Sequence, residues 1–434
     1  MKTSGSKAVS TKLRQIAEVS GKAPGMVWTT LSHHIDLEWL YEAYRRTRKD
    51  ASPGVDGITR KEYEANLDGN LRSLLENFKS GRYRAQPSRR TYIPKGDGKY
   101  RPLGIPTLED KILQRAVLMV MEAIYEQDFC ESSYGFRPGR TAHQALEEIR
   151  QTLMGWRGGW VLDVDIEGFF DNLDHTHLRN FLDKRIRDGV LRRTIDKWLK
   201  AGILEKGELK KLKSGTPQGG VISPLLSNLY LHEVLDKWFE DVVKVRTRGR
   251  VRLVRYADDF TVLCEHRIDA ERIMKVLPKR LGKYGLQLHL EKTKMICFKP
   301  PEGGEGKNSF DFLGFTHYWG KSRRGRWAVK KKTSKGRLRR ALKSVSEWCR
   351  RNMHLDLGKQ REALSKKLEG HYSYYGVTGN SKSLNSFREE VVKRWRRWLM
   401  RRSQRGIMSW EKFCREVKAN ILPLPRIVHS VYRK

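Results

Sequence analysis

The chain has 434 residues, and its 88 Lys and Arg against 50 Asp and Glu give a formal net charge of +38 at pH 7. This length exceeds one ordinary hydrophobic core and predicts about two to four domains or subdomains. The excess of positive charge favours a polyanionic partner. A membrane-spanning protein is disfavoured because no apolar run approaches the roughly 18 residues that a spanning helix needs.

The N-terminus and the cysteines bear on the compartment. Residues 1–15 are polar and basic, without the apolar segment of a signal peptide, and we expect residues 1–25 to be mobile. The five cysteines, at 130, 264, 297, 349 and 414, form no Cys-x-x-Cys pair. This pattern predicts reduced thiols in a cytoplasmic protein and disfavours a zinc site.

Apolar spacing and capping residues predict the helices. They are expected over 37–48, 60–79, 111–127, 141–150 with Thr141 as N-cap, 224–238 with Ser223 as N-cap, 268–284, 337–351 and 391–404.

A basic hairpin is predicted within residues 80–106, where Gly96-Asp97-Gly98 separates two β-prone runs. Its arms carry Lys95, Lys99 and Arg101, which suit the binding of a triphosphate. Taken alone, a basic hairpin is more often simply solvated. The loop at 134–140 then combines two aromatic residues with Arg137 and Arg140, which we take as candidate RNA contacts.

Residues 160–166 form a strand by composition. Strict alternation would place Asp163 and Asp165 on one face, opposite Trp160, Leu162 and Val164. Acidic residues in so apolar a strand need a cation or a basic side chain as partner.

The loop 215–220 is rich in Gly and Pro, and its Gln218 and Gly219 lie where backbone can approach a ligand closely. A purely structural turn explains this loop equally well.

The apolar runs 251–254 and 260–264 predict a hairpin with Ala257-Asp258-Asp259 as its turn. Adjacent carboxylates repel each other unless a cation lies between or beside them, and Mg²⁺ with substrate phosphates is the obvious candidate. A bare Asp-Asp pair is usually a solvated turn, so the neighbouring motifs decide between these interpretations. A second hairpin is expected over 310–319.

Residues 321–434 hold 33 Lys and Arg against 8 Asp and Glu. We expect 323–326 and 330–332 to be linker, followed by basic helices that provide the main nucleic-acid footprint. In 391–404, Trp395 and Trp398 should face a core, and the arginines should face outward toward RNA phosphates. These candidate RNA contacts are Arg394, Arg396, Arg397, Arg401 and Arg402.

Together these motifs resemble the reverse transcriptase and maturase proteins encoded by bacterial group II introns. The resemblance covers roughly residues 50–430, and seven motifs in fixed order make it specific. They are Ile-Pro-Lys with Arg-Pro-Leu-Gly-Ile-Pro (93–106), Tyr-Gly-Phe-Arg-Pro-Gly-Arg (134–140), Asp-Ile-Glu-Gly-Phe-Phe-Asp (165–171), Thr-Pro-Gln-Gly-Gly-x-x-Ser-Pro (216–224), Tyr-Ala-Asp-Asp (256–259), Glu-Lys-Thr (291–293) and Phe-Leu-Gly-Phe (312–315).

The resemblance implies an α+β right-hand polymerase, with fingers and palm built on antiparallel sheet and an α-helical thumb or maturase domain. The expected parts are a mostly helical extension over 1–79, fingers and palm over 80–320, and a basic thumb over 325–434. By similarity the catalytic acids are Asp165, Asp258 and Asp259, with Asp163 as the positional rival of Asp165.

The resemblance also implies ligands and partners. Metal ions, Mg²⁺ in this family, would lie at Asp165, Ile166, Asp258 and Asp259. The expected dNTP contacts are Lys95, Lys99, Arg101, Phe170, Gln218, Gly219 and Lys292. The expected partners are intron RNA, an RNA template, and a DNA primer or target.

One family layout carries a nuclease region after the basic helices, and this sequence shows none, so second-strand cleavage by this chain is not expected. The segments Gly-Val-Thr-Gly-Asn (376–380) and Arg-Arg-Ser-Gln (401–404) resemble the compact, endonuclease-lacking class called IIC. Two rival interpretations stay open. One is a reverse transcriptase of a diversity-generating, retron or CRISPR-associated lineage, and the other is a splicing factor whose polymerase is inactive.

Overall fold

The computed structural model describes residues 4–96, 99–210, 214–216, 219–301, 308–322, 324–402, 409–417 and 422–431. The chain forms two compact units. Unit 1 comprises residues 1–145 and 162–294, and unit 2 comprises residues 146–161 and 295–434.

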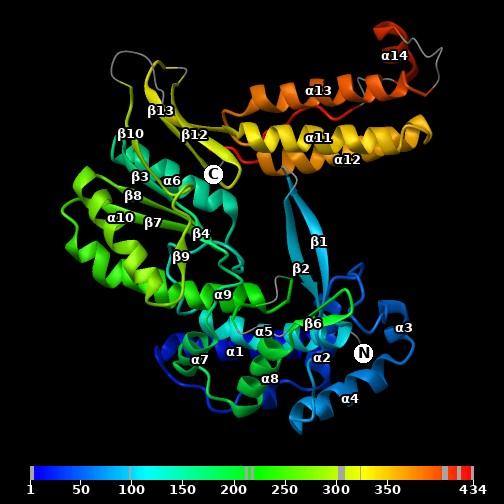
Figure 1. The fold of residues 1–434 in the computed structure, drawn as a ribbon, viewed down its shortest axis with the longest axis vertical. Coiled ribbons are helices and arrows are strands. Elements are labelled where there is room, and N and C mark those ends of the chain that lie inside the picture. Colours follow the sequence, from blue (N-terminus) through cyan, green and yellow to red (C-terminus); the bar gives the residue numbers. More distant parts are fainter. Residues whose placement is uncertain are drawn as a thin grey trace. The chain divides into compact units, whose positions relative to one another are not determined.

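Three helices form the base of unit 1: α1 (Ser4–Lys22), α2 (Leu37–Arg46) and the almost fully buried α5 (Leu108–Tyr125), which contact one another (Figure 1). The expectation that residues 1–25 are mobile is wrong for the described part. Val9 and Ile16, two helical turns apart, are buried at 1% and 2% exposure. Burial of this apolar stripe stabilises a helix whose composition looks like that of a tail.

The helix predicted over 60–79 is interrupted. It divides into α3 (Arg60–Glu64), which begins at a capping box between Thr59 and Glu62, and α4 (Leu67–Lys79). Asn66 between them has φ −132° and ψ 50°, outside the helical region. The remaining helices of unit 1 are α7 (His175–Asp183), α8 (Gly189–Lys200), α9 (Ser223–Leu231) and α10 (Arg267–Gly282), with short helical turns η1 (Ser32–His34), η2 (His232–Asp236), η3 (Phe239–Val243) and η4 (Lys244–Arg246).

Helix α9 begins one residue earlier than predicted. Ile222 is its N-cap and Ser223 is already helical, so the expected capping role of the Ser223 side chain is corrected. Helix α6 (Ala142–Gly155) starts after Thr141, which exchanges hydrogen bonds with Gln144 as a capping pair.

Two sheets position the site in unit 1. The predicted basic hairpin is β1 (Ser88–Gly96) paired antiparallel with β2 (Lys99–Ile105), and β5 (Ile203–Glu205) and β6 (Glu208–Lys210) extend its sheet. In the other sheet, β3 (Gly159–Val164) neighbours β8 (Asp259–Cys264), which pairs antiparallel with β7 (Val251–Tyr256). Helix α10 packs against β8, and the short β4 (Ile166–Glu167) pairs with β9 (Gln287–Leu288).

Unit 2 combines a sheet with a helical bundle. Strands β11 (Ser309–Phe312), β12 (Phe315–Lys321) and β13 (Trp327–Thr333) form an antiparallel sheet, and β10 (Lys294–Phe298) lies beside β3. The hairpin predicted over 310–319 is confirmed. The linker predicted at 330–332 is wrong, because these lysines belong to β13, where Lys331 is buried near Glu147.

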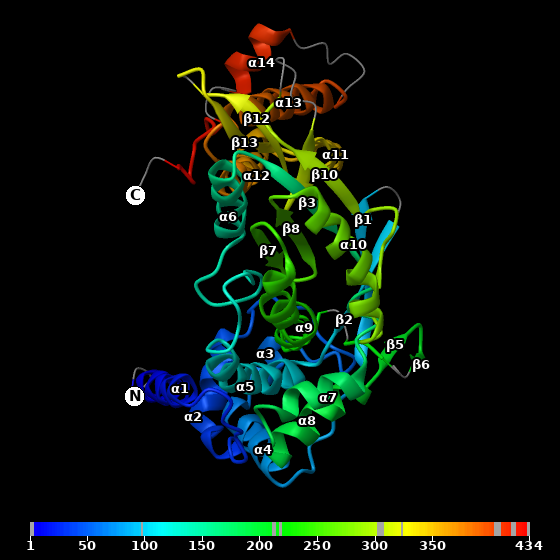
Figure 2. The same ribbon diagram turned by 90° about the vertical axis from the view of Figure 1, so that its left-hand side faces the viewer.

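Helices α11 (Lys335–Arg351), α12 (Leu357–Tyr375) and α13 (Ser381–Leu399) pack side by side around one apolar core in unit 2 (Figure 2). Helix α14 (Trp410–Val417) adds Phe413 to that core. Within the described ranges, no helix is both long and apolar enough to cross a membrane. The predicted α+β class, with antiparallel sheets and a helical C-terminal region, is confirmed.

Candidate active site

The hairpin that carries the paired carboxylates has a two-residue turn. Tyr256 pairs with Asp259, so the turn is Ala257-Asp258, one residue shorter than predicted. Ala257 has φ +57°, a conformation that costs a residue with a Cβ about 1–2 kcal/mol. Asp258 is half-buried and Asp259 is exposed at the start of β8. The turn therefore presents two carboxylates from a strained backbone, as functional turns often do.

Gly135 lies directly against this turn. A Cβ at Gly135 would lie 2.4 Å from the backbone nitrogen of Ala257 and 2.9 Å from the carbonyl carbon of Tyr256. Only glycine permits this approach. The motif at 134–140 is thus packed behind the acidic turn, an adjacency that the sequence did not reveal.

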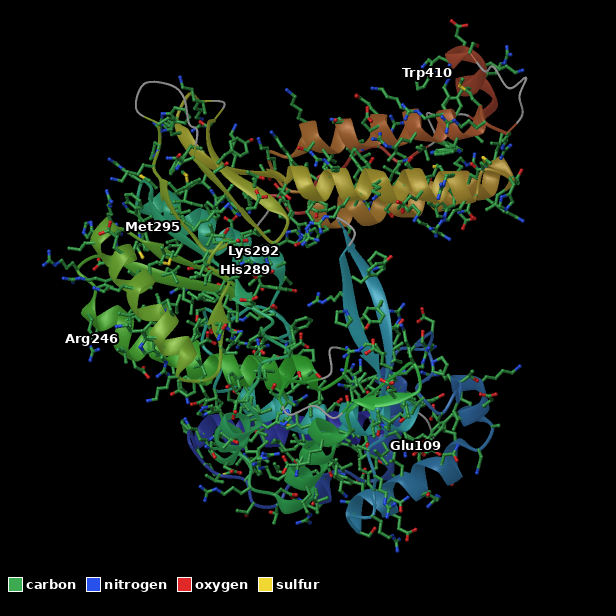
Figure 3. The ribbon with its side chains drawn as sticks, in the orientation of Figure 1. Glu109, Arg246, His289, Lys292, Met295 and Trp410 are labelled. Atoms are coloured by element: carbon green, nitrogen blue, oxygen red, sulfur yellow. The ribbon has the colours of Figure 1, made fainter. Side chains whose placement is uncertain are left out.

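Asp165 follows β3 and forms an ion pair with Lys292. Its Oδ2 lies 2.7 Å from Lys292 Nζ, and the two side chains are 33% and 58% exposed. The backbone N–H of His289 donates to the carbonyl of Asp165 at 2.8 Å, which ties the segment after β9 to this strand end (Figure 3). Asp163, the positional rival, lies half-buried within β3.

The acids fit hard cations by donor type. Asp165 follows β3 and Asp259 opens β8, the neighbouring strand of the sheet. Carboxylate oxygens are the ligands that such ions prefer. In this structure Asp165 already pairs with one cationic group, the Lys292 ammonium. In the described part of the chain, however, no three His, Cys, Asp or Glu side chains are grouped as a metal site. The structure therefore brings Asp165 to Lys292 and does not gather the three acids into one coordination shell.

The segment after Asp165 lies beside the loop before α9. Thr216 N–H donates to the carbonyl of Phe170 at 2.9 Å, and Gly215 N–H donates to that of Leu173 at 2.7 Å. The half-buried Phe170 ring packs edge-on against Phe169. These bonds bring the segment at Phe170 next to Gly215 and Thr216.

The same loop also reaches the basic hairpin. Gly219 has φ +115°, and a Cβ there would lie 2.5 Å from the carbonyl oxygen of Gly104 in β2. Arg101, on the same strand, is exposed. The predictions for Gln218 and for the side chains of Lys95 and Lys99 fall outside the described residues.

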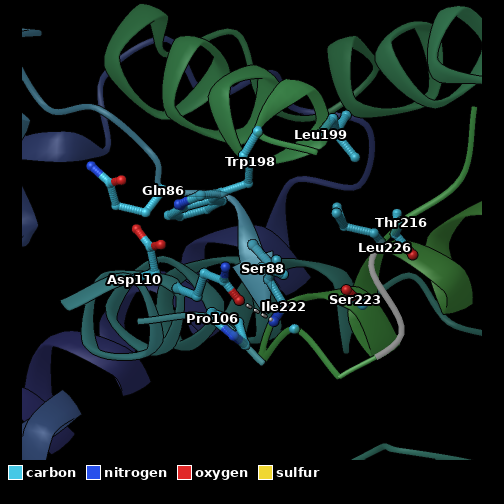
Figure 4. Close-up of a pocket in the computed structure, with 13 residues that line it drawn as sticks. Gln86, Ser88, Pro106, Asp110, Trp198, Leu199, Thr216, Ile222, Ser223 and Leu226 are labelled. Carbon is cyan, nitrogen blue, oxygen red and sulfur yellow. Dashed lines mark hydrogen bonds between the residues drawn. The ribbon is translucent and has the colours of Figure 1, made fainter. Parts of the chain in front are cut away.

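Gln114 anchors the far end of this loop, a role that the sequence did not indicate. Its side-chain carbonyl accepts from Val221 N–H at 2.8 Å and from Ile222 N–H at 3.4 Å (Figure 4). Gln114 and Ile222 line a cavity of about 20 Å³, room for about one water. Asp110 lines it too, and burial raises the pKa of this carboxyl to about 6. Because α5 is buried, the loop is fixed to the rigid base of unit 1.

The structure corrects the prediction that Arg137 contacts RNA. Its side chain is 3% exposed, and it donates to Glu126 and to the carbonyls of Cys130 and Ser133. A guanidinium so enclosed cannot reach an RNA phosphate, because its donors are already satisfied inside the fold. Arg137 shapes the loop that carries Gly135. Arg140 remains at the surface, paired with the exposed Glu131 at 2.6 Å.

On α13 the aromatic residues face inward as predicted. Trp395 is fully buried and donates to Gln360, whereas the half-buried Trp398 donates to Ser346. Arg397 and Arg401 are exposed, and Arg401 lies over the ring of Trp398. The other arginines have partners within unit 2: Arg394 bonds Glu390, Arg396 lies over Trp410, and Arg402 donates to the carbonyls of Met353 and Leu355.

Comparisons with known proteins define the class. Residues 93–317 match the family model described as reverse transcriptase (RNA-dependent DNA polymerase). Protein YkfC of Escherichia coli K12 is 36% identical over 325 residues, which cover 67% of this chain and 83% of that protein. The group II intron-encoded protein LtrA of Lactococcus lactis is 43% identical over 228 residues, which cover 52% of this chain and 38% of LtrA.

Among solved structures, the telomerase of Candida albicans, in complex with a fragment of telomeric RNA, aligns over 84% of this chain and 69% of its own. Its TM-score of 0.43 and identity of 14% are too low to support an argument.

The chain belongs to the reverse transcriptase family. Within that family it is of the group II intron type, so the predicted resemblance and the RNA-directed DNA polymerase class are confirmed. Members of the family work with divalent metal ions and RNA templates, which agrees with the carboxylates at the β7–β8 turn.

Proposed function

We propose that this chain copies its own group II intron RNA into DNA and binds that RNA to assist its splicing, in the cytoplasm. The observation that carries the proposal is the pair of carboxylates at the β7–β8 turn, in the sheet whose strand β3 leads into Asp165, within the region that matches the family. Residues 80–320 would serve as fingers and palm, and 325–434 as thumb.

In this proposal Asp165, Asp258 and Asp259, with Ile166 beside the first, would hold Mg²⁺ ions. Bound there, the ions would lower the pKa of the primer 3′-hydroxyl and neutralise charge on the leaving pyrophosphate. The chain's own residues position the reactants. Lys95, Lys99 and Arg101 would hold the triphosphate while the loop at Gln218 and Gly219 lies along the nucleotide.

Phe170 would select deoxynucleotides. Its ring, fixed against Phe169 and by the backbone bond from Thr216, is suited to stand where a ribose 2′-hydroxyl would lie. Lys292 is paired with Asp165 in this structure. In the proposal, the Lys292 ammonium would leave Asp165 and act on the departing pyrophosphate.

RNA binding is proposed for the basic surface of unit 2 together with Arg140. Arg397 and Arg401 are the strongest candidates because both side chains are exposed, whereas Arg394 and Arg396 are half-buried and Arg402 donates to two backbone carbonyls. Replacing Arg397 and Arg401 by Gln should weaken RNA binding and reduce the slope of log K against log salt by up to about 2. An unchanged slope would remove this helix from the RNA footprint.

The test of the polymerase is primer extension on an RNA template with Mg²⁺ and dNTPs. Asp258→Asn should abolish extension and leave RNA affinity within about twofold, because the basic surface is elsewhere. Asp241→Asn, at an exposed acid of η3, is the matched control and should extend normally. A folded wild type that binds RNA without extending a primer would favour the splicing-factor interpretation.

A further inference from the structure

Arg255, the residue before Tyr-Ala-Asp-Asp, is completely buried although it carries a charge. Its side chain and that of Asp236 are both 0% exposed. Nε donates to Asp236 Oδ1 at 2.7 Å and Nη2 donates to Oδ2 at 2.5 Å. This bidentate geometry is the strong form of an Arg–carboxylate pair.

The remaining donors of Arg255 reach three further segments. Nη1 donates to Asn228 Oδ1 at 2.9 Å and to the carbonyl of Ala257 at 3.0 Å. Nη2 also donates to Ser133 Oγ at 2.7 Å. One guanidinium thus connects α9, η2, the 130–137 loop and the acidic turn.

The backbone around Arg255 is held as well. Its N–H donates to the carbonyl of Ser132, and its carbonyl accepts from Tyr134 N–H, each at 2.8 Å. Asn228 Nδ2 donates to the carbonyl of Gly135 at 2.7 Å, and Gly135 packs on Ala257. The acidic turn is therefore held in two ways. The carbonyl of Ala257 accepts from Arg255, and the loop that carries Gly135 packs against the turn.

A buried ion pair is weak evidence for stability alone, because desolvation offsets most of its attraction. Its best-attested use is to specify one geometry. Here the bonded atom is the carbonyl of Ala257, the residue with φ +57°, immediately before Asp258.

We propose that Arg255, clamped by Asp236, is the positioning residue of the acidic turn, and that it sets the orientation in which Asp258 and Asp259 meet a divalent cation. The expected effect on catalysis rests on the proposed polymerase function. The expected effect on the affinity for a divalent cation does not, because it concerns only the position of Asp258 and Asp259. Lys cannot replace Arg here, since one ammonium cannot serve Asp236, Asn228, Ser133 and Ala257 from the same fork.

The test measures Mn²⁺ affinity of the full-length protein by electron paramagnetic resonance, together with the Mg²⁺ dependence of primer extension. A comparison of Asp258→Asn with the wild type first identifies which bound Mn²⁺ lies at the acidic turn. Arg255→Lys should weaken that event about tenfold, lower kcat about tenfold to a hundredfold, and leave the KM for primer–template within about twofold.

The matched control is Arg185→Lys. Arg185 is also buried and holds Asp128 and the carbonyls of Ala23 and Met26, away from the acidic turn. It should lower stability comparably without moving Mn²⁺ affinity. If Arg255→Lys fails to fold, Ser133→Ala removes one acceptor only and should weaken Mn²⁺ binding about twofold to threefold.

Folded Arg255→Lys and Ser133→Ala proteins with wild-type Mn²⁺ affinity would overturn the inference, as would an equal loss in Arg185→Lys. A wild type that binds Mn²⁺ through Asp258 but extends no primer would contradict the polymerase proposal. In that case the Mn²⁺ affinities alone decide on Arg255.

Discussion

Two hairpins of this chain turn through left-handed backbone, and they do so by different means. In β7–β8 the residue with positive φ is Ala257, and a buried arginine holds its carbonyl. In β11–β12 the turn is Leu313-Gly314, with φ of +48° and +81°, and Tyr374 donates to the carbonyl of Leu313. Both turns keep a residue with a Cβ at positive φ, and in both a side chain donates to the carbonyl of that residue. The second turn adds a glycine at positive φ, whereas in the first the strained residue is followed directly by two aspartates. The comparison indicates that a hydrogen bond to the carbonyl accompanies the strained residue in each turn, and that a buried guanidinium supplies it where carboxylates must be aimed.

The largest expected effect comes from filling the contact behind the first turn. Gly135→Ala places a Cβ against backbone atoms of Tyr256 and Ala257, neither of which can rotate away. We expect a loss of about 3 kcal/mol in the free energy of unfolding, measured in urea, with primer extension abolished. Gly155→Ala, in the last turn of α6 where a Cβ meets open space, should lower neither. A Gly135→Ala protein of normal stability would mean that the turn can shift.

The two hairpins should differ in how their stability responds to acid. His317 in β12 is fully buried, stacked on Phe310 at 4.8 Å, and its pKa is lowered from 6.5 to about 3 by burial and by Lys331. The folded state thus binds fewer protons than the unfolded state. The stabilisation that comes from keeping His317 neutral is fully present above pH 6.5 and is lost as pH falls toward about 3.

At pH 5 the loss should be about 2 kcal/mol, at about 1.4 kcal/mol per pH unit. His317→Phe keeps the stacked ring and should flatten the pH dependence of unit 2 unfolding between pH 7 and 5, followed by Trp fluorescence. The exposed His354→Phe is the control. Identical pH profiles for wild type and His317→Phe would contradict the assignment.

Gly314→Ala should cost about 1.5 kcal/mol in urea unfolding, because φ is +81° and the new Cβ would lie 2.9 Å from the Tyr375 hydroxyl. Gly325→Ala has φ +73° but open space, so it isolates the backbone contribution. Primer extension should persist in both variants. A larger loss in Gly325→Ala would show that the contact with Tyr375 is not felt.

The smallest effect is expected for Ala257→Gly. Relief of the positive φ is offset by the greater freedom of glycine in the unfolded chain, which leaves a gain of about 0.5 kcal/mol. The extension rate should nevertheless fall, since the turn becomes less restricted. Higher stability with an unchanged rate would mean that the strain at Ala257 serves no positioning role.

The sequence predicted what is local. The hairpin at 251–264, the hairpin around Gly96 and the inward Trp395 follow from periodicity and turn residues over a few positions. The order of motifs likewise predicted Asp165, Asp258 and Asp259 as the catalytic acids, because chemistry restricts those residue types.

What the sequence missed depends on partners far along the chain. Helix α1 is specified by burial against α5, about 100 residues away, which the polarity of residues 1–25 concealed. Arg137 resembled a surface cation because Glu126 and the carbonyls that enclose it become neighbours only in the fold. In β13 the inward alternation of Val329, Lys331 and Thr333 was present, but a buried lysine disguised it.

The N-terminal segment has a consequence for how the chain is made. Trp28 N–H donates to the carbonyl of Arg185, and Arg187 N–H donates back to the carbonyl of Trp28, both at 2.8 Å. These bonds close a loop of about 160 residues, so they cannot form until that length of chain has left the ribosome. At the usual roughly 5–20 residues per second, the segment at Trp28 waits on the order of 10–30 s for Arg185 and Arg187. During synthesis, the segment that follows α1 therefore gains these bonds only after α7 has been made.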